Sequence, residues 1–409
     1  MSLKIPYPPF TEKAPTQPIN LAQVKYPQYG RVLEDFNEGE VFCHPRGMTI
    51  TRSFGIEFVT TFMETNPLYF NEDYAKAHGL KGIVISPRLV MNIALSLGVQ
   101  NDSEKAIANL GYYNVCFAKA VYPGNTLRAF TKVLKREIKE GGKPGIVTIR
   151  TVAINREEDI VLQYDRKIMV APAGKQSKPT TIQNRPFPEL KELTITLPEA
   201  KTEYPKDLTG INTYFENFNV GNIIVHANGR TITDEHIPWT YRVMNTHPLH
   251  YDRLYTGLRP VPNQPQSGVE WEAPRALPVE GTTRAPGKDP IVYGGLVFAW
   301  LWGLASRDTT ENGIADFGYT EGYHTQPVVS GDTIYAISRV LAKEDGPKGY
   351  HAGLVTFQLI GIKNIRPKEA IEKFGGDLFV KENNKKKLGK EKIPEKIFEI
   401  ERRVLIKKR

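Results

Sequence analysis

Hydrophobic and polar positions follow two patterns that recur in the same order along the chain. Two stretches, 89–97 and 296–304, are apolar on nearly every face of a helix, so each must be wrapped by other parts of the protein. The segments after them are rich in β-branched residues and separated by Gly- and Pro-containing turns, which is typical of strands. The predicted strands are 126–133, 145–153, 160–170, 333–341 and 354–362. The pattern predicts an α+β fold in which an antiparallel sheet curls around a buried helix, twice.

The second half of the chain repeats the first. The segment Asn109-Leu-Gly-Tyr corresponds to Asp316-Phe-Gly-Tyr at an offset of 207 residues, and the same offset aligns 84–90 with 291–297. Two copies, unlike a long array of repeats, indicate the duplication of a domain. A chain of 409 residues is long enough for two such domains, each with its own core.

The repeat and local changes in composition divide the chain into segments. The linker between the two units is rich in Pro, Lys and Thr and should cross the outside of the fold. We expect an N-terminal extension (1–30), a first unit (31–172), the linker (173–207), a second unit (208–365) with an insertion at 257–290, and a basic C-terminal tail (366–409).

Charge and cysteine content exclude several classes of protein. The net charge is +9, but +7 of it lies in residues 366–409, where glutamates are interspersed with the lysines. We therefore expect a solvated, partly helical extension and no nucleic-acid partner. Two cysteines cannot build a disulfide framework, the N-terminus lacks a signal-peptide pattern, and the longest apolar stretch, 291–305, is shorter than a membrane span. We expect a cytoplasmic protein that does not contact a membrane.

Each unit carries a Pro-Leu turn after its first short helix. The turn reads Glu64-Thr-Asn-Pro-Leu-Tyr69 in the first unit and Asn245-Thr-His-Pro-Leu-His250 in the second. This order of elements, with Gly294-Gly295 opening the second apolar helix, resembles the MaoC-like dehydratases of the hotdog fold, whose motif reads Asp-x-Asn-Pro-Leu-His. The first copy has Glu64 and Tyr69 where the motif has Asp and His. The second copy keeps the histidine but has the amide Asn245 in place of the carboxylate. The resemblance implies two hotdog units side by side, with an acyl-CoA thioester bound between them.

Several short segments are similar to the mesaconyl-CoA hydratase (β-methylmalyl-CoA dehydratase) branch of that family. They are Ala108-Asn-Leu-Gly-Tyr112, Val121-Tyr-Pro-Gly124, Met244-Asn-Thr246 with His250, and Val292-Tyr-Gly-Gly295. The resemblance implies a hydro-lyase that hydrates and dehydrates an acyl-CoA thioester reversibly, with Asn at the carboxylate position. CoA is then part of the substrate, and no separate cofactor is implied. We also expect a homo-oligomer.

The residue types assign the chemistry to the second unit. His250 titrates in the range that an acid and base needs, and the Asn245 amide can place a water molecule. The backbone amides of Gly294-Gly295, at a helix N-terminus, can polarise the thioester oxygen. The first unit has Pro87-Arg88 at that place, where proline offers no N–H and arginine fills the space. We therefore expect the first unit to be a scaffold.

A structural interpretation competes with each of these assignments. His250 could cap its loop, Asn245 could serve the turn itself, and Gly294-Gly295 could simply begin a helix. His247 and His324 are further candidates for the substrate pocket. For His247 we favour a hydrogen bond within the loop, and for His324 a satisfied, half-buried position.

The remaining motif residues and two further functions complete the expectations. Glu64 and Tyr69 could form an acid–base pair, but the neighbouring Pro87-Arg88 favours a structural role. No His, Cys and Asp residues have the spacing of metal ligands, so we expect no metal. A general R-specific enoyl-CoA hydratase and a non-catalytic acyl-CoA-binding or scaffold subunit both stay open, since neither copy of the motif is complete.

Overall fold

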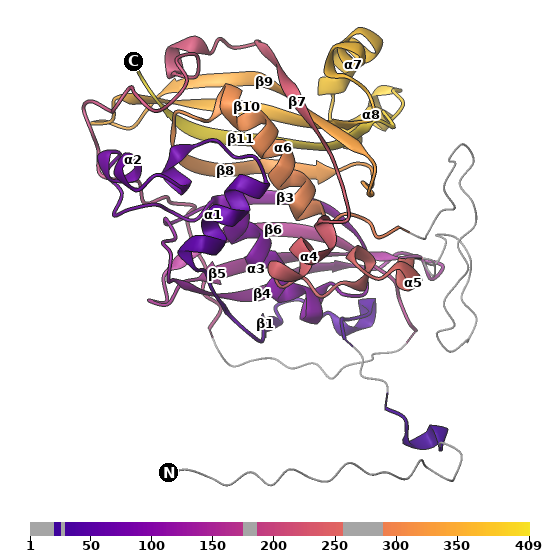
Figure 1. The fold of residues 1–409 in the computed structure, drawn as a ribbon. Coiled ribbons are helices and arrows are strands. Elements are labelled where there is room, and N and C mark those ends of the chain that lie inside the picture. Colours follow the sequence, from indigo (N-terminus) through magenta and orange to yellow (C-terminus); the bar gives the residue numbers. More distant parts are fainter. Residues whose placement is uncertain (1–19, 26–28, 175–185, 257–288) are drawn as a thin grey trace, which may run out of the picture.

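A continuous antiparallel sheet runs through both units, with two long helices packed on one face (Figure 1). The computed structural model describes residues 20–25, 29–174, 186–256 and 289–409. The strand order is β1-β4-β5-β6-β3 in the first unit and β8-β11-β10-β9-β7 in the second, with β2 paired to β4. Each unit is thus a sheet curved over its own helix, as the hydrophobic pattern predicts.

The first unit contains six strands, and the short helices come before the long one. Its strands are β1 (Val41–Cys43), β2 (Met48–Thr49), β3 (Ala106–Cys116), β4 (Thr126–Glu137), β5 (Gly145–Ile154) and β6 (Ile160–Val170). Its helices are η1 (Leu21–Gln23), η2 (Leu33–Asp35), α1 (Arg52–Thr61), η3 (Pro67–Tyr69), α2 (Glu72–Ala77) and α3 (Pro87–Asp102).

The second unit repeats this order, with additional helices near its end. Its strands are β7 (Ile223–Thr231), β8 (Gly313–His324), β9 (Thr333–Asp345), β10 (Ala352–Lys363) and β11 (Lys396–Lys407). Its helices are η4 (Phe215–Asn217), α4 (His236–Arg242), η5 (Pro248–His250), α5 (Arg253–Thr256), α6 (Gly294–Thr309), α7 (Pro367–Phe374), η6 (Gly375–Phe379), α8 (Glu382–Lys385) and η7 (Lys386–Leu388).

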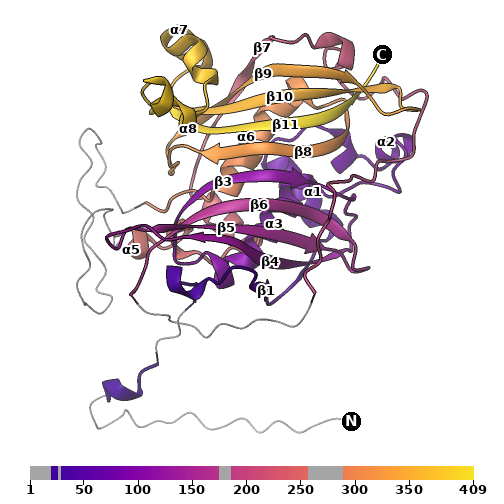
Figure 2. The ribbon, with the colours of Figure 1, turned by 180° about the vertical axis from the view of Figure 1, so that it is seen from behind.

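The helices α3 and α6 form the centre of the molecule. Each is 16 residues long, and nearly every side chain on each is buried, which explains why both sequences are apolar all round. They pack against each other, and Asn92 Nδ2 of α3 donates a hydrogen bond to the carbonyl of Gly295 in α6 at 3.1 Å. Strands β3 and β8 pair directly above them, so that the two sheets become one (Figure 2).

The segment predicted as a basic tail is part of the second unit. Strand β11 lies between β10 and β8, in the place that β6 takes in the first unit. The predicted unit boundary at residue 365 and the solvated extension are therefore wrong for residues 396–407. Residues 364–395 separate β10 from β11, and the charged residues of β11 conceal its strand pattern. Several of those charges are buried in ion pairs, such as Lys396 with Glu399 at 2.8 Å.

The helical part of this segment covers the outer face of the sheet. Ala370 and Leu378, from α7 and η6, pack against Ile337, Ile360 and Ile362 of β9 and β10. The described part of the linker also crosses the outside of the fold, as its composition predicts, and its Tyr204 packs on Ile314 and Leu405. Apart from residues 289 and 290, the predicted insertion at 257–290 lies outside the described residues.

Candidate active site

The two Pro-Leu turns have the same architecture. Asn66 and His247 each precede the proline and accept a hydrogen bond from the amide two residues on, at 3.0 Å for Asn66 Oδ1 and 3.2 Å for His247 Nδ1. Each side chain also reaches the other unit: Asn66 Nδ2 donates to the Gly313 carbonyl at 2.9 Å, and His247 Nε2 lies 3.5 Å from the Ala106 carbonyl. The imidazole of His247 thus makes the loop hydrogen bond that we favoured for it.

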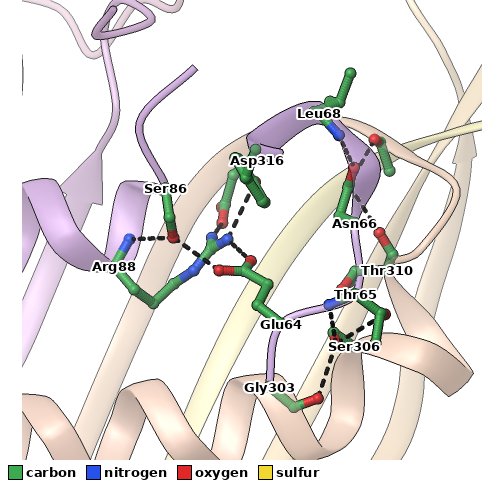
Figure 3. Close-up of polar contacts among 12 residues, drawn as sticks. Glu64, Thr65, Asn66, Leu68, Ser86, Arg88, Gly303, Ser306, Thr310 and Asp316 are labelled. Atoms are coloured by element: carbon green, nitrogen blue, oxygen red, sulfur yellow. Dashed lines mark hydrogen bonds and ion pairs between the residues drawn. The ribbon is translucent and has the colours of Figure 1, made fainter. Parts of the chain in front are cut away.

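In the first unit, a buried ion network holds Glu64 (Figure 3) and Tyr69, the residues at the carboxylate and histidine positions of the motif. Arg88 is 1% exposed, and its guanidinium pairs with Glu64 and, at 2.7 Å, with Asp316 Oδ2. Ser86 Oγ donates to Glu64 Oε2 at 2.8 Å, and Arg88 Nη2 donates to Tyr69 Oη at 3.0 Å. Glu64 is held by these two donors and is not free to act as a general base.

The charges in this network stabilise one another. Burial alone would lower the pKa of Arg88, but Glu64 and the other anionic neighbours raise it well above its usual value. Burial raises the pKa of Asp316 to about 6, and the positive charge of Arg88 opposes that rise. The arrangement supports the structural interpretation of Glu64 and Tyr69.

The first unit's remaining cavity is small and covered. Its volume is about 70 Å³, and its wall includes Tyr69, Pro87 and Phe117. Residues Ile195 and Thr196 of the linker complete the wall, and Thr196 N donates a hydrogen bond to the carbonyl of Ala118 at 2.7 Å. The linker and the ion network together close this half.

The second unit's turn borders a larger cavity, of about 280 Å³. Its walls come from η5, the N-terminus of α6 and the end of β8, and from β3 and β6 of the first unit. Five of the six residues predicted for the site line this cavity: Asn245, His247, His250, Gly294 and His324. Gly295 does not line it. The cavity therefore lies between the two units, beside the turn of the second unit.

The orientation of His250 fixes which nitrogen can act. Its Nδ1 lies 2.8 Å from the carbonyl oxygen of Ile291, which can only accept a hydrogen bond, so Nδ1 carries a proton. In the neutral ring, Nε2 is then the basic nitrogen. Asn245 is 1% exposed, and its Oδ1 accepts the backbone amide of His247 at 2.9 Å. The hydrogen bond within the turn thus occupies Oδ1 of Asn245, and its Nδ2 is the group that can donate to a water molecule.

The two long helices differ at their N-termini. Ser86 caps α3, because its Oγ accepts the amide of Arg88 at 3.3 Å. The corresponding residue of α6 is Tyr293, whose side chain makes no capping hydrogen bond. Within the described part of the chain, no hydrogen bond uses the amides of Gly294 and Gly295. These N–H groups, at the positive end of the helix dipole, remain available for an oxygen atom of a ligand.

The two glycines also permit close packing. A Cβ atom on Gly294 would lie 2.7 Å from the imidazole of His324, and one on Gly295 would lie 2.1 Å from Asn92 Oδ1. Gly294 therefore lets His324 approach the helix end, whereas Gly295 is needed where α3 crosses α6. Gly295 therefore has a packing role at the helix crossing, whether or not its amide also binds a ligand.

His324 is a half-buried, neutral wall of the cavity. Burial lowers its pKa to about 4, and Tyr112 Oη lies 3.3 Å from its Nε2, within hydrogen-bond distance. This is the satisfied position that we favoured, although the ring also lines the cavity. The first unit has Phe117 at the equivalent position.

Sequence reasoning missed several polar residues of this cavity, among them Tyr112 and Arg166. Arg166 lies in the predicted strand 160–170, and its neighbours on the same strand face, Tyr164 and Ile168, are both buried. A charged residue at an alternate position of an apolar strand face was the signal available in the sequence.

Known hydratases and dehydratases resemble this chain in sequence. A family profile described as "Mesaconyl-CoA hydratase" matches residues 13–182. The chain is 29% identical to a β-methylmalyl-CoA dehydratase of Chloroflexus aurantiacus, over 82% of this chain and 89% of that protein. It is 27% identical to a mesaconyl-CoA hydratase of Cereibacter sphaeroides, over 82% and 90% of the two chains.

Solved structures give the same fold. A MaoC domain dehydratase of Chloroflexus aurantiacus superposes with a TM-score of 0.71 at 25% identity, covering 93% of this chain and 98% of that one. A Mycobacterium tuberculosis protein described as a double hotdog has a TM-score of 0.63 at 18% identity, with 92% and 98% covered. The chain therefore has the double-hotdog fold and is similar to MaoC-like dehydratases. It is an enzyme of the hydro-lyase class, related to β-methylmalyl-CoA dehydratase and mesaconyl-CoA hydratase.

Two structural findings limit what else the described residues contain. None of the described helices combines the length and apolar character that crossing a bilayer requires. The same residues include no group of three or more His, Cys, Asp or Glu side chains placed to hold a metal ion.

Proposed function

We propose that this chain hydrates mesaconyl-CoA to β-methylmalyl-CoA, and catalyses the reverse dehydration, in the cavity beside His250. The carrying observation is that, of the two equivalent sites, only the second combines an open cavity, a histidine with a basic Nε2 and an uncapped helix N-terminus. The names and coverage of the relatives support a CoA thioester as the substrate.

His250 supplies both proton transfers. Its Nε2 takes a proton from water, and the resulting hydroxide adds to the β-carbon of the enoyl thioester. The proton then passes from Nε2 to the α-carbon, so that water has been added across the double bond. Asn245 Nδ2 donates to the water oxygen and holds it in line with the β-carbon. The Ile291 carbonyl keeps Nδ1 protonated throughout, which fixes the ring for both steps.

The helix N-terminus stabilises the charge that develops between these two steps. When hydroxide adds, an electron pair moves to the thioester oxygen, which becomes enolate-like. The amide of Gly294, which lines the cavity, can donate to that oxygen, with the amide of Gly295 next to it in the helix, and the dipole of α6 favours the negative charge. The thioester itself activates the α-carbon, so the proposed chemistry calls for no cofactor beyond the CoA of the substrate.

The amide at position 245 suits a substrate that has a second carboxylate. A carboxylate side chain at this place would repel the free carboxylate of mesaconyl-CoA, and each would raise the pKa of the other. An asparagine avoids both effects.

Purified full-length protein assayed with mesaconyl-CoA and crotonyl-CoA tests the proposal. We expect hydration of mesaconyl-CoA with a kcat/KM at least tenfold above that for crotonyl-CoA. His250→Gln should lower kcat about 100-fold or more, since glutamine can still donate to the Ile291 carbonyl but cannot take up the proton.

The matched control is Tyr69→Phe, which changes the equivalent position of the closed first unit. Its kcat should stay within about twofold of the wild-type value. Preference for crotonyl-CoA would indicate a general enoyl-CoA hydratase, and turnover of neither thioester would indicate a binding or scaffold subunit. A His250→Gln variant with wild-type kcat would refute the site. The homo-oligomeric state and the cytoplasmic location stay predictions.

A further inference from the structure

The deep wall of the open cavity contains a buried arginine. Arg166 is 3% exposed, projects from β6 and pairs in register with Tyr112 of β3. Both residues line the cavity together with Asn245 and His250. A guanidinium in the interior must be matched by acceptors, because burial of unmet charged donors is costly.

The protein supplies hydrogen-bond acceptors for only some of the N–H groups of the Arg166 guanidinium. Nη2 donates to Asp102 Oδ1 at 3.0 Å and to Ser103 Oγ at 3.2 Å. Nε is buried and has no hydrogen-bond partner among the described residues. Asp102 is shared, because its other oxygen accepts Thr131 Oγ1 at 3.2 Å. One edge of the guanidinium is thus anchored, and donors remain for a further acceptor.

A second donor on the same wall is also unmet. Tyr293, at the start of α6, lines the cavity, and its hydroxyl is buried near Ser96 without a hydrogen bond of normal geometry. Burial raises its pKa well above the usual value, so this hydroxyl keeps its proton. These donors line an open cavity and are available to a ligand that brings acceptors, and a carboxylate matches the planar fork of arginine.

The closed half contains two carboxylates whose equivalents in the open half are not carboxylates. Its equivalent arginine is Arg402, which pairs in register with Tyr319 as Arg166 does with Tyr112. Two of the chain's own carboxylates, Asp316 and Glu64, lie in that half and act electrostatically on Arg402. The corresponding residues of the open half are both amides.

These two amides are Asn109 and Asn245, and both line the open cavity. Apart from Asp102, which anchors Arg166, the protein thus has carboxylates at these positions in the closed half and amides at the same positions in the open half. A substrate carboxylate would meet no anionic repulsion at either position.

We propose that Arg166 is the specificity-determining residue that binds the free carboxylate of a dicarboxylic acyl-CoA, an inference that rests on the proposed function of this cavity. The carboxylate accepts hydrogen bonds from the guanidinium edge that Asp102 leaves open. This contact places the double bond of the substrate between His250 and the N-terminus of α6.

Equilibrium binding to the full-length protein tests this assignment without turnover. The probes are succinyl-CoA, which ends in a carboxylate, and butyryl-CoA, which ends in a methyl group, measured by calorimetry. The wild type should bind succinyl-CoA at least tenfold more tightly than butyryl-CoA. Arg166→Gln should weaken succinyl-CoA binding about tenfold to a hundredfold and change butyryl-CoA binding less than twofold.

Two further variants keep the outcome interpretable. Arg402→Gln removes the equivalent buried arginine of the closed half and should keep the wild-type preference. If Arg166→Gln does not fold, Arg166→Lys retains the charge beside Asp102 and should still weaken succinyl-CoA binding about threefold to tenfold. Equal losses for both thioesters, or no loss for either, would overturn the assignment.

The same variants separate this inference from the proposed function. Wild-type protein that prefers succinyl-CoA through Arg166, but does not hydrate mesaconyl-CoA, refutes the function and leaves the carboxylate site standing. Hydration of mesaconyl-CoA at an unchanged kcat/KM in Arg166→Gln refutes the carboxylate site and leaves the function standing.

Discussion

Single substitutions between equivalent positions decide which half of the molecule is open. Arg88 fills the first site with its guanidinium, whereas Gly295 at the equivalent position has no side chain. The Tyr69 hydroxyl accepts a hydrogen bond from Arg88 in the ion network, whereas His250 faces a cavity. The order of the strands and of the long helix is the same around both sites, so the chemical difference arises from these side chains.

At this scale, the pKa of His324 leads to a prediction about stability. Burial lowers that pKa to about 4, from an ordinary value of 6.5. Between these values the unfolded chain binds a proton that the folded chain does not, so the free energy of unfolding falls as the pH falls from 6.5 toward 4. His324→Phe, which copies Phe117 of the first half, should reduce this fall between pH 7 and 4.5 by about 2 kcal/mol.

Urea unfolding of both proteins at pH 7 and pH 4.5 measures this difference. A pH-independent change in stability cancels when the two pH values are compared within each protein. Buried His44 and His78, whose pKa values are also lowered to about 4, should leave part of the pH dependence in the variant. Parallel pH profiles for the two proteins would contradict the role of burial at His324.

At the scale of elements, the beginnings of α3 and α6 set the two halves apart. Both helices are equally long and buried, but Ser86 uses its hydroxyl to cap α3, and Pro87 offers no N–H there. The N-terminus of α6 has neither feature, since the amides of Gly294 and Gly295 have no capping side chain. One helix end is closed by its own residues, and the other is left for a ligand.

Gly294→Ala tests the importance of this helix end. The added Cβ would lie 2.7 Å from the His324 ring, so the ring or the helix start must shift and the amides lose their alignment. We expect kcat for the preferred thioester to fall about tenfold or more, because misplaced oxyanion donors cost one or more orders of magnitude in rate.

Gly376→Ala is the matched control, since a Cβ atom at Gly376 meets nothing within 4 Å. Its kcat and thermal midpoint should equal those of the wild type. Wild-type kcat in Gly294→Ala would show that the chemistry does not depend on the N-terminus of α6.

At the scale of the whole molecule, the last strand joins the two units. Strand β11 pairs with β10 on one side and β8 on the other, and β8 pairs with β3 of the first unit. Its Phe398 and Ile400 belong to the largest apolar core, which contains residues of both halves. Without β11, the sheet of the second unit would be divided.

A chain that ends at residue 365 should therefore fail to fold. It loses the strand at the centre of the second sheet and exposes β8 and β10 as apolar edges, which favours aggregation. Circular dichroism, thermal unfolding and size-exclusion chromatography can compare it with the full chain. A chain that lacks only Lys408 and Arg409, beyond the end of β11, is the control and should unfold cooperatively. Cooperative unfolding of the shorter chain would show that β11 is dispensable.

The sequence by itself determined the features that depend on local patterns and on the duplication. Stretches apolar on nearly every helix face located α3 and α6, and the offset of 207 residues aligned the two halves. Segments rich in β-branched residues located five of the eleven strands in the described residues, namely β4, β5, β6, β9 and β10. The Pro-Leu turns and Gly294 pointed to the second half because proline, glycine and histidine have distinct backbone and proton chemistry. Those properties belong to the residues themselves.

Only the tertiary structure decided which distant segments meet. Strand β11 follows β10 after residues 364–395, and nothing local specifies that it pairs between β10 and β8. Arg166, from the first unit, reaches the cavity beside His250 of the second because β3 and β8 join the two sheets. Strand pairing and burial of charge depend on partners far along the chain. For this reason, the local motifs could point to the half with the larger cavity but not to the arginine that faces it.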